Sequence, residues 1–252
     1  MNRIVSLVPS ITELLCDLGL AEQIVGRTGF CIHPREVVRR IPKVGGTKSV
    51  NVEKVRALAP THVIVNVDEN EKPTADAIAQ FVPHLVVTHP LGPLDNLRLY
   101  RQIGAAFARE REAEALCARF QSAYDEVAAM RFPRRRVLYL VWKKPWMTVS
   151  RNTYISRMLA LFGMQTVPAA SKVRYPRLKD IRGGRFDLVL LPSEPYPFRE
   201  RDLRAVAAIS ARPAALIDGE MTSWYGGRAI RGLAYLAEFS ARLAKSSPPG
   251  AA

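Results

Sequence analysis

Cys31 and His33 stand two residues apart in a loop that we expect to follow a short strand at 24–26. In an extended loop, side chains at i and i+2 point to the same side, so this pair could offer soft ligands to zinc, iron or copper. A packed cysteine beside a hydrogen-bonding histidine explains the same residues without a metal. Glu69 and Glu71, in another loop after a strand, could complete such a site or stay solvated.

Aromatic and basic side chains gather in loops after the predicted strands of the second half. All three tryptophans of the chain are expected in such loops, beside residues that carry positive charge. The aromatic rings could stack on a flat or bulky ligand, and the cations could meet its negative groups. The alternative is that Trp142 and Trp224 only seal an interface between domains. The candidate ligand-binding residues here are Trp142, Lys143, Lys144, Trp146, Tyr154, Trp224, Tyr225 and Arg228.

Known catalytic signatures are absent from the sequence. It has no Gly-x-Ser-x-Gly elbow, no P-loop, no Gly-x-Gly-x-x-Gly fingerprint and no His-Glu-x-x-His motif. The segment Gly45-Gly46-Thr47-Lys48 lacks the spacing of a phosphate-binding loop. Three cysteines are too few for a disulfide framework and fit reduced thiols. The sequence motifs therefore give no indication of an enzyme.

The composition is that of a globular protein with a strong excess of positive charge. The 252 residues carry 37 Lys and Arg against 23 Asp and Glu, a net charge of +14, and 48% of residues are hydrophobic. Basic residues are spread along the chain, with one tight cluster at 134–136. A solvated basic surface explains this charge, and a polyanionic partner is the alternative. Without a zinc-finger or RNP motif, we expect no nucleic-acid partner.

No apolar run approaches the ~20 residues that a transmembrane helix needs. The first residues also lack the apolar run and cleavage site of a signal peptide. The expected location is therefore the cytoplasm as the sequence is written, or the periplasm if a leader is missing from it.

Strands and helices are expected to alternate along the first 94 residues. Apolar runs at 3–8, 24–26, 62–66 and 85–88 predict buried strands. Between them, Ser10 and Glu13 predict a helix that begins with a capping box, and Asn51 predicts a second helix cap. Such alternation is typical of α/β proteins with parallel sheets, which bind ligands outside the carboxyl ends of the strands.

A long helical segment follows and separates two similar halves. From Asp95 to Met130 the chain has no proline, and one apolar helix face carries Leu116, Phe120, Tyr124 and Val127. Strands are then expected at 136–141, 186–192 and 215–218, with helices through 155–161 and over 224–243. The predicted organisation is an N-terminal α/β lobe at 1–94, a connecting helical segment at 95–133 and a C-terminal α/β lobe at 134–252.

At this level the sequence resembles the class III periplasmic-binding-protein superfamily over nearly its whole length. The opening Arg3-Ile-Val-Ser-Leu-Val-Pro-Ser-Ile-Thr-Glu13, Val44-Gly-Gly46 and Asn51-Val-Glu-Lys-Val-Arg-Ala-Leu-Ala-Pro60 carry the resemblance, which is strongest to the cobalamin-binding branch. The superfamily comprises helical-backbone receptors for cobalamin, ferric siderophores, haem and metal ions. The resemblance implies two Rossmann-like α/β lobes joined by a long backbone helix, with ligand held in the cleft between the lobes and no catalysis.

The resemblance also implies a partner. In transport members, an acidic residue on each lobe docks to an ABC permease, and Glu53 matches the first of these residues. The second should fall near Arg177–Asp180, where this chain offers Lys179 and Asp180.

The main functional prediction is a substrate-binding protein for a corrinoid, a metal chelate or a transition metal ion, without a catalytic cofactor. Cys31 and His33 would line one wall of the site, and the aromatic and basic residues of the second half would line the other. One alternative is a cytoplasmic metal-dependent enzyme with Cys31 and His33 as ligands and Glu69 as base. Another is a basic module that binds nucleic acid.

Overall fold

The computed structural model describes residues 2–169 and 172–245. Residues 246–252, at the end of the predicted C-terminal lobe, lie outside the described residues. By its contacts the chain divides into two compact units. Unit 1 comprises Met1–Pro90, Asn96–Ala118 and Tyr225–Arg228, and unit 2 comprises Leu91–Asp95, Arg119–Trp224 and Ala229–Ala252. The three-part division at 94 and 133 stays a prediction.

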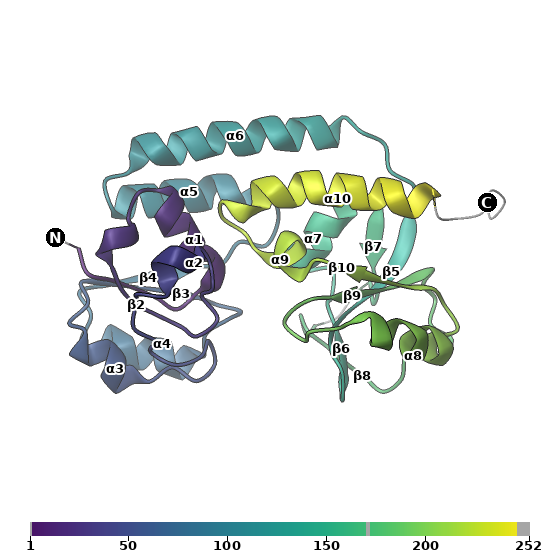
Figure 1. Cartoon of the computed structure of the whole chain (residues 1–252), viewed down its shortest axis with the longest axis horizontal. Helices are drawn as coiled ribbons and strands as arrows, with labels where there is room; N and C mark the ends of the chain where they lie inside the picture. Colours follow the sequence, from purple (N-terminus) through teal and green to yellow (C-terminus); the bar gives the residue numbers. More distant parts are fainter. Residues whose placement is uncertain (1, 170–171, 246–252) are drawn as a thin grey trace. The chain divides into compact units, whose positions relative to one another are not determined.

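Unit 1 is built on a parallel sheet with strand order β2-β1-β3-β4 (Figure 1). Its strands are short runs of valine, isoleucine and leucine, which suit a sheet that is covered on both faces. All four strands fall where the apolar runs predict them. Their bounds are β1 (Ile4–Ser6), β2 (Ile24–Arg27), β3 (His62–Asn66) and β4 (His84–Thr88).

Helices cover both faces of this sheet. On one face, Val55 of α3 and Ile78 of α4 pack with Val5 and Val63 in a single apolar cluster. Helices α1 and α5 lie on the opposite face (Figure 1). The bounds are α1 (Pro9–Asp17), α2 (Arg35–Val38), α3 (Val52–Ala57), α4 (Lys72–Ala79) and α5 (Asp95–Ala106), with a 3-10 turn at Ala21–Gln23.

One of the two predicted helix caps is confirmed and the other is wrong. The side chain of Asn51 accepts a hydrogen bond of 2.9 Å from the backbone N–H of Lys54, as expected for an N-cap. Helix α1 instead begins at Pro9, with Val8 as an N-cap that makes no side-chain bond. Proline fits the first helical position because its missing N–H would have no partner there. The Glu13 side chain therefore takes no part in a capping box and pairs with another residue of unit 1.

Unit 2 contains a mixed sheet with strand order β10-β9-β5-β6-β8, and β7 also pairs with β5. Strands β7, β9 and β10 run parallel, whereas β6 and β8 pair antiparallel with their neighbours. The sequence did not predict the three short strands β6, β7 and β8. The bounds are β5 (Arg135–Trp142), β6 (Trp146–Thr148), β7 (Met164–Thr166), β8 (Arg177–Leu178), β9 (Leu188–Pro192) and β10 (Ala214–Ile217).

Helix α8 covers one face of this sheet, and α7, α9 and α10 lie on the other (Figure 1). Val206 of α8 packs with Leu138, Leu140 and Val189 of the strands. The last helix expected over 224–243 is present as α10, but it begins four residues later, at Arg228, because Gly226 adopts a φ of +82° that a helix does not accommodate. The bounds are α7 (Tyr154–Leu161), α8 (Glu200–Ser210), α9 (Gly219–Ser223) and α10 (Arg228–Lys245).

The long helix predicted between the halves is present as α6 (Glu110–Ala128), with 19 residues. Its residues up to Ala118 belong to unit 1, and those from Arg119 belong to unit 2. The α/β fold class with parallel strands is therefore confirmed. Among the described residues, none of the helices combines the length and the apolar character that crossing a membrane requires.

Candidate functional site

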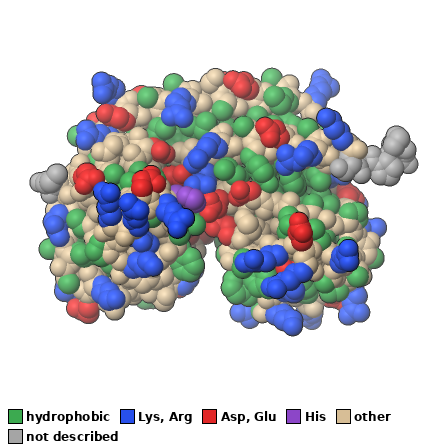
Figure 2. Space-filling model, in the orientation of Figure 1, with side chains coloured by type: hydrophobic (Ala, Val, Ile, Leu, Met, Phe, Trp, Pro, Cys, Tyr) green, Lys and Arg blue, Asp and Glu red, His purple; other side chains and the backbone are tan. Residues whose placement is uncertain are grey.

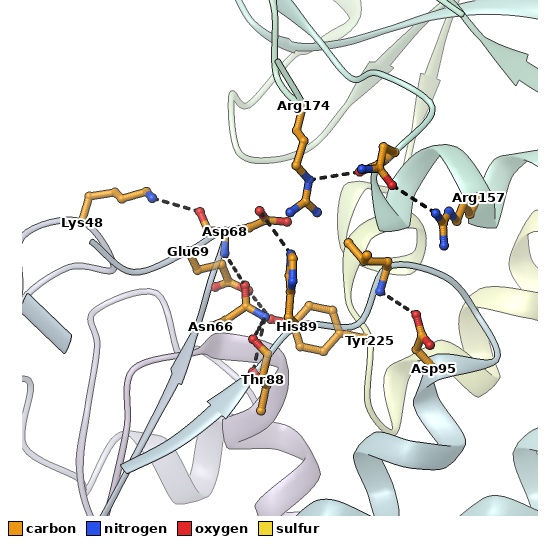
Figure 3. Close-up of polar contacts among 12 residues, drawn as sticks. Lys48, Asn66, Asp68, Glu69, Thr88, His89, Asp95, Arg157, Arg174 and Tyr225 are labelled. Carbon is orange, nitrogen blue, oxygen red and sulfur yellow. Dashed lines mark hydrogen bonds and ion pairs between the residues drawn. The ribbon is translucent and has the colours of Figure 1, made fainter. Parts of the chain in front are cut away.

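The carboxyl ends of β3 and β4 carry a group of polar side chains in unit 1, which we call the unit 1 edge cluster. It consists of Asn66, Asp68, Glu69, His89 and Tyr225, and Figure 3 shows all five. Parallel strands bring their carboxyl ends to the same edge of a sheet, where α/β proteins bind ligands. The backbone turns at Gly226, and residues 225–228 belong to unit 1. Tyr225 therefore joins this cluster although it lies far along the chain.

Hydrogen bonds of Asn66 hold the backbone of this cluster in place. Its Nδ2 donates to the carbonyl of Thr88 at 3.0 Å, and its Oδ1 accepts from the backbone N–H of Asp68 at 2.8 Å (Figure 3). The backbone N–H of Asn66 in turn donates to Oδ1 of Asn70 at 2.8 Å. Because Asn66 and Asn70 are buried, these bonds fix the loop after β3 firmly against the end of β4.

Glu69 and Tyr225 form a short hydrogen bond in the cluster. The phenol of Tyr225 donates to Oε1 of Glu69 over 2.6 Å, and Tyr225 is buried. Burial and the charge of Glu69 both raise the pKa of Tyr225 well above its ordinary value, so the phenol keeps its proton. Glu69 therefore lies at the expected strand end, in contact with one of the predicted ligand-binding residues.

Asp68 faces His89 and Lys48. The imidazole Nε2 of His89 lies 3.8 Å from Oδ1 of Asp68, and the ammonium of Lys48 donates to the backbone carbonyl of Asp68 at 2.9 Å. Lys48 also lies 3.3 Å from a carboxylate oxygen of Glu71. This side of the cluster presents groups of both signs, all partly exposed and able to bind a polar ligand.

Cys31 lies in the core of unit 1, with 0% of its surface exposed. Its Sγ lies 3.0 Å from the hydroxyl of Thr12, which donates to it, and 3.2 Å from that of Thr28. Burial raises the pKa of the Cys31 thiol, so it stays protonated. His33 is half-buried in the following loop. Among the described residues, no group of three or more His, Cys, Asp or Glu could hold a metal ion.

Arg228 and Glu13 form a buried ion pair within unit 1. Nε of Arg228 lies 2.7 Å from Oε2 of Glu13, and Nη2 lies 2.9 Å from Oε1. The sequence predicts Arg228 and Tyr225 on the wall formed by the second half of the chain, whereas the contacts group residues 225–228 with unit 1. Contact of Arg228 with a ligand stays a prediction.

In unit 2, Trp142 and Trp146 close the hairpin of β5 and β6. The expectation that they lie in loops is wrong, because only Lys143-Lys144-Pro145 separates the strands. Trp142 is 42% exposed and packs edge-to-face on Tyr196, with ring centroids 5.5 Å apart. Trp146 instead packs against the apolar core of the unit. Trp142 is thus the tryptophan that offers a free aromatic surface.

Lys143 lies in the turn of this hairpin and reaches a buried carboxylate. Its ammonium lies 2.6 Å from Oδ1 of Asp202 in α8, whose side chain is 6% exposed. The hydrogen bond from Lys143 lowers the pKa of Asp202. The predicted cation is therefore paired within unit 2.

Trp224 is buried beside a carboxylate at the ends of β9 and β10. Its Nε1 donates to Oε1 of Glu194 over 2.6 Å, and the hydroxyl of Ser223 donates to the same oxygen at 2.9 Å. Burial raises the pKa of Glu194 despite these bonds. The expectation that Trp224 lies in a loop after a strand is wrong, because helix α9 follows β10 and Trp224 is the C-cap of that helix. Its indole N–H is bonded inside the unit.

Tyr154 begins α7 and is buried, 5% exposed. Thr153 caps this helix by accepting a 3.3 Å bond from the N–H of Ser156. The residue before the cap, Asn152, receives hydrogen bonds from two arginines, Arg157 and Arg174. Sequence reasoning missed this group and also missed His89 and Glu194. Their places after β4 and β9 were the available signal, whereas nothing in the local pattern marks Arg157.

The chain is similar to known binding proteins. A family model described as periplasmic binding protein matches residues 4–181. An uncharacterized ABC transporter substrate-binding lipoprotein of Bacillus subtilis, YvrC, is 33% identical over 50% of this chain and 40% of its own length. The vitamin B12-binding protein of Pectobacterium atrosepticum is 24% identical over 70% of this chain and 66% of its own length. The chain thus spans less than two thirds of these relatives.

Solved structures agree on the fold. The periplasmic haem-binding protein RhuT of Roseiflexus sp. RS-1 superposes with a TM-score of 0.79 at 23% identity, covering 95% of this chain and 97% of that one. The periplasmic vitamin B12-binding protein BtuF of Vibrio cholerae superposes with a TM-score of 0.78 at 16% identity, covering 98% of both chains. At these identities the likeness shows a shared fold.

Proposed function

The chain belongs to the periplasmic binding protein family, and from that premise we propose that it is a non-catalytic binding protein for a corrinoid, a haem or a comparable metal chelate. The vitamin B12-binding protein and the haem-binding protein RhuT are named for ligands that are both flat macrocycles with polar side arms. The observation that carries the proposal is Trp142, an exposed indole held by Tyr196 at the strand ends of unit 2. Such a ring offers a face on which a macrocycle stacks.

The unit 1 edge cluster supports the same proposal. Its carboxylates can accept hydrogen bonds from amides on the rim of a macrocycle, and its imidazole can donate to a rim carboxylate. The loop that carries Asp68 and Glu69 is held in place by Asn66, so these groups need little rearrangement to bind. The half-buried His33 remains part of the proposal as a residue that contacts the ligand through a hydrogen bond, whereas the fully buried Cys31 is bonded to Thr12 and Thr28 and supports the loop from within.

A metal-dependent enzyme has less support. The Cys31 thiol is buried and its pKa is raised, which disfavours the thiolate that a metal ligand requires. A metal-dependent enzyme would retain a stoichiometric metal ion through purification, and elemental analysis of the purified protein decides this point.

We extend the proposal to a partner, the permease of an ABC importer. Glu53 in α3 has a side chain that is 81% exposed, with Arg56 at 3.7 Å. A carboxylate in such a position is available to an arginine of another protein. Crosslinking of the E53C variant to a co-expressed permease, compared with crosslinking of the exposed E36C variant, tests this docking role.

The binding proposal is tested by intrinsic tryptophan fluorescence. The purified protein is titrated with cobalamin, haem, a panel of ferric siderophores and divalent metal ions, with correction for inner-filter absorbance. We expect saturable quenching by one macrocycle or chelate. Quenching by a free divalent ion alone would favour the metal-site reading, and no response to any ligand would contradict the proposal.

A further inference from the structure

Unit 2 holds most of the positive charge of the chain. It carries 22 Lys and Arg against 11 Asp and Glu, whereas unit 1 carries 15 against 12. Figure 2 shows this excess as blue side chains that outnumber the red ones over unit 2. The tight basic cluster at 134–136, at the start of β5, belongs to it. The proposed ligand site uses the carboxyl ends of strands, so it gives this cluster no role.

Three chain segments meet at the amino-terminal edge of the unit 2 sheet. Strands β5, β9 and β10 are parallel neighbours, with Val137 opposite Leu188 and Val189 opposite Ala214. The residues just before these strands therefore lie along one edge, opposite the carboxyl ends at which α/β proteins bind ligands. We call this edge the unit 2 amino edge, and it comprises residues 130–136, 185–187 and 209–212.

The unit 2 amino edge carries exposed cations that lack a partner. Its segments hold six arginines and one carboxylate, that of Asp187. Four of the arginines are exposed, and in the part of the chain that the structure describes no hydrogen bond, ion pair or ring contact engages their guanidinium groups. Each of these guanidinium groups therefore keeps its five N–H donors for a partner outside the chain. The four residues are Arg131, Arg134, Arg185 and Arg212.

The backbone that carries these cations is fixed by hydrogen bonds. The N–H of Arg136 donates to Oδ2 of Asp187 at 2.7 Å, and the N–H of Asp187 donates to the carbonyl of Arg136 at 2.8 Å. Nη2 of Arg136 lies 3.7 Å from Oδ1 of Asp187, so the one carboxylate of the edge is already paired. The carbonyl of Pro213, next to Arg212, accepts a 2.9 Å bond from Val189. Because neighbouring strands lie only about 4.8 Å apart, like charges stay close together, and an anionic surface would relieve their repulsion.

Two large apolar side chains are exposed on the same edge. Met130, directly before Arg131, is 51% exposed, and Ile209, in the last turn of α8, is 40% exposed. Exposed apolar side chains beside unpaired cations are typical of surfaces that bind a lipid bilayer. The cations meet the phosphates of the headgroups, and the apolar side chains enter the boundary with the acyl chains.

This combination favours a bilayer over other polyanions. A nucleic acid would satisfy the arginines, but its phosphate backbone offers no apolar layer for Met130 and Ile209. The cations also come from three separate segments along an edge, which fits a broad and flat partner. We propose that the unit 2 amino edge is a docking surface for a membrane that contains anionic phospholipids. This role is independent of the ligand bound at the carboxyl ends of the strands.

Co-sedimentation of the full chain with lipid vesicles tests the proposal. One set of vesicles contains phosphatidylcholine alone, and the other contains about one third phosphatidylglycerol. Each unpaired arginine near an anionic surface should strengthen binding about fivefold, so we expect the four together to favour the anionic vesicles by several hundredfold. Raising the salt concentration from about 0.05 M to about 0.5 M should weaken this binding at least tenfold.

Matched triple variants locate the binding surface. R134Q/R185Q/R212Q should weaken binding to anionic vesicles about a hundredfold, whereas R134K/R185K/R212K keeps the charges and should bind like the parent. R151Q/R201Q/R204Q removes the same charge from exposed arginines of unit 2 outside this edge, and it should bind like the parent. M130S/I209S should weaken binding several-fold and leave its dependence on salt unchanged.

The contrary outcomes are equally defined. Equal binding to the two sets of vesicles, or binding to neither, would overturn the proposal. An equal loss in both glutamine triples would show that net charge alone drives binding, and it would overturn the assignment to this edge. Binding to duplex DNA that anionic vesicles fail to displace would replace the membrane by a nucleic acid as the partner.

Discussion

Glu13 and Arg228 stand 215 residues apart in the sequence and share a bidentate ion pair that is almost completely buried in unit 1. Their side chains are only 8% and 6% exposed. Two parallel N–H···O bonds give this pair a defined geometry and offset the desolvation of both charges. The pair ties the first residue of α10 to the middle of α1.

Removal of one partner should therefore destabilise unit 1. We expect R228M to lower the free energy of unfolding by about 3–5 kcal/mol, because it leaves the Glu13 carboxylate buried without its partner. Urea denaturation followed by circular dichroism measures this loss. The double variant E13L/R228M should recover much of it, and a double variant as unstable as R228M would contradict the assignment.

Glu194 should make stability fall as the pH rises. Its pKa is raised by burial, so the folded protein keeps this proton at pH values where the unfolded chain has released it. Its contribution is complete below the unfolded pKa of about 4.3 and is lost as the pH rises through the folded pKa. E194Q should flatten this fall, as read from urea midpoints at a series of pH values. E126Q, an exposed change on α6, should leave the profile unchanged.

Asp202 should have the opposite effect on the pH dependence of stability. Lys143 lowers its pKa, so the stability that it contributes is present above the unfolded pKa of about 3.9 and is lost as the pH falls. We expect K143M to cost about 1–3 kcal/mol at neutral pH, because the Asp202 carboxylate is left buried with one partner fewer. The same change should reduce the loss of stability on acidification. Parallel acid titrations of the parent and variant test both statements.

Trp142 should contribute directly to ligand affinity. W142A removes the exposed ring and should weaken binding of the identified macrocycle about fivefold to tenfold. Calorimetric titration measures the change without relying on tryptophan emission. M130A, which truncates another exposed apolar side chain, is the control and should bind like the parent. Unchanged affinity in W142A would remove this residue from the proposed site.

The cysteines should react slowly in the native protein. Burial raises the pKa of the Cys31 and Cys117 thiols, and burial with nearby acidic groups raises that of Cys16 to about 12. Thiolates react and thiols do not, so we expect little colour with Ellman's reagent at neutral pH and three thiols in urea. Rapid native labelling that Zn²⁺ suppresses would instead indicate metal binding at Cys31.

Local patterns were sufficient to predict most of the α/β framework. The run His62–Asn66 is both the predicted strand and the observed β3, because five residues with an apolar centre fit a buried parallel strand. Asn51 was predictable as a cap because its side chain bonds only three residues ahead. Strand β8 and helix α8 escaped prediction. The first has only two residues, and the second follows a proline-rich loop and begins at Glu200 without an N-cap side chain of the usual type.

The site was less predictable because its contacts join distant residues. Tyr225 reaches Glu69 across 156 positions, and neither neighbourhood in the sequence indicates the other. The grouping of Tyr225 with the second half followed from chain order, whereas the glycine at 226 redirects the backbone into unit 1. The burial of individual side chains was equally unpredictable from the sequence. Trp142 and Trp224 look alike in the sequence, yet one is exposed and the other is bonded to Glu194.

The Asn66 side chain both donates and accepts a hydrogen bond, and this affects the free energy of ligand binding. The backbone N–H of Asn66 donates to Oδ1 of Asn70, and the backbone N–H of Asp68 donates to Oδ1 of Asn66. Hydrogen bonds to side chains, rather than to a neighbouring strand, therefore order these positions. A ligand that binds to such a loop does not have to order it. Binding therefore avoids an entropic cost of about 1–2 kcal/mol for each backbone residue that is already ordered. Hydrogen exchange at Asp68 should accordingly be slow before any ligand is added and nearly unchanged afterwards.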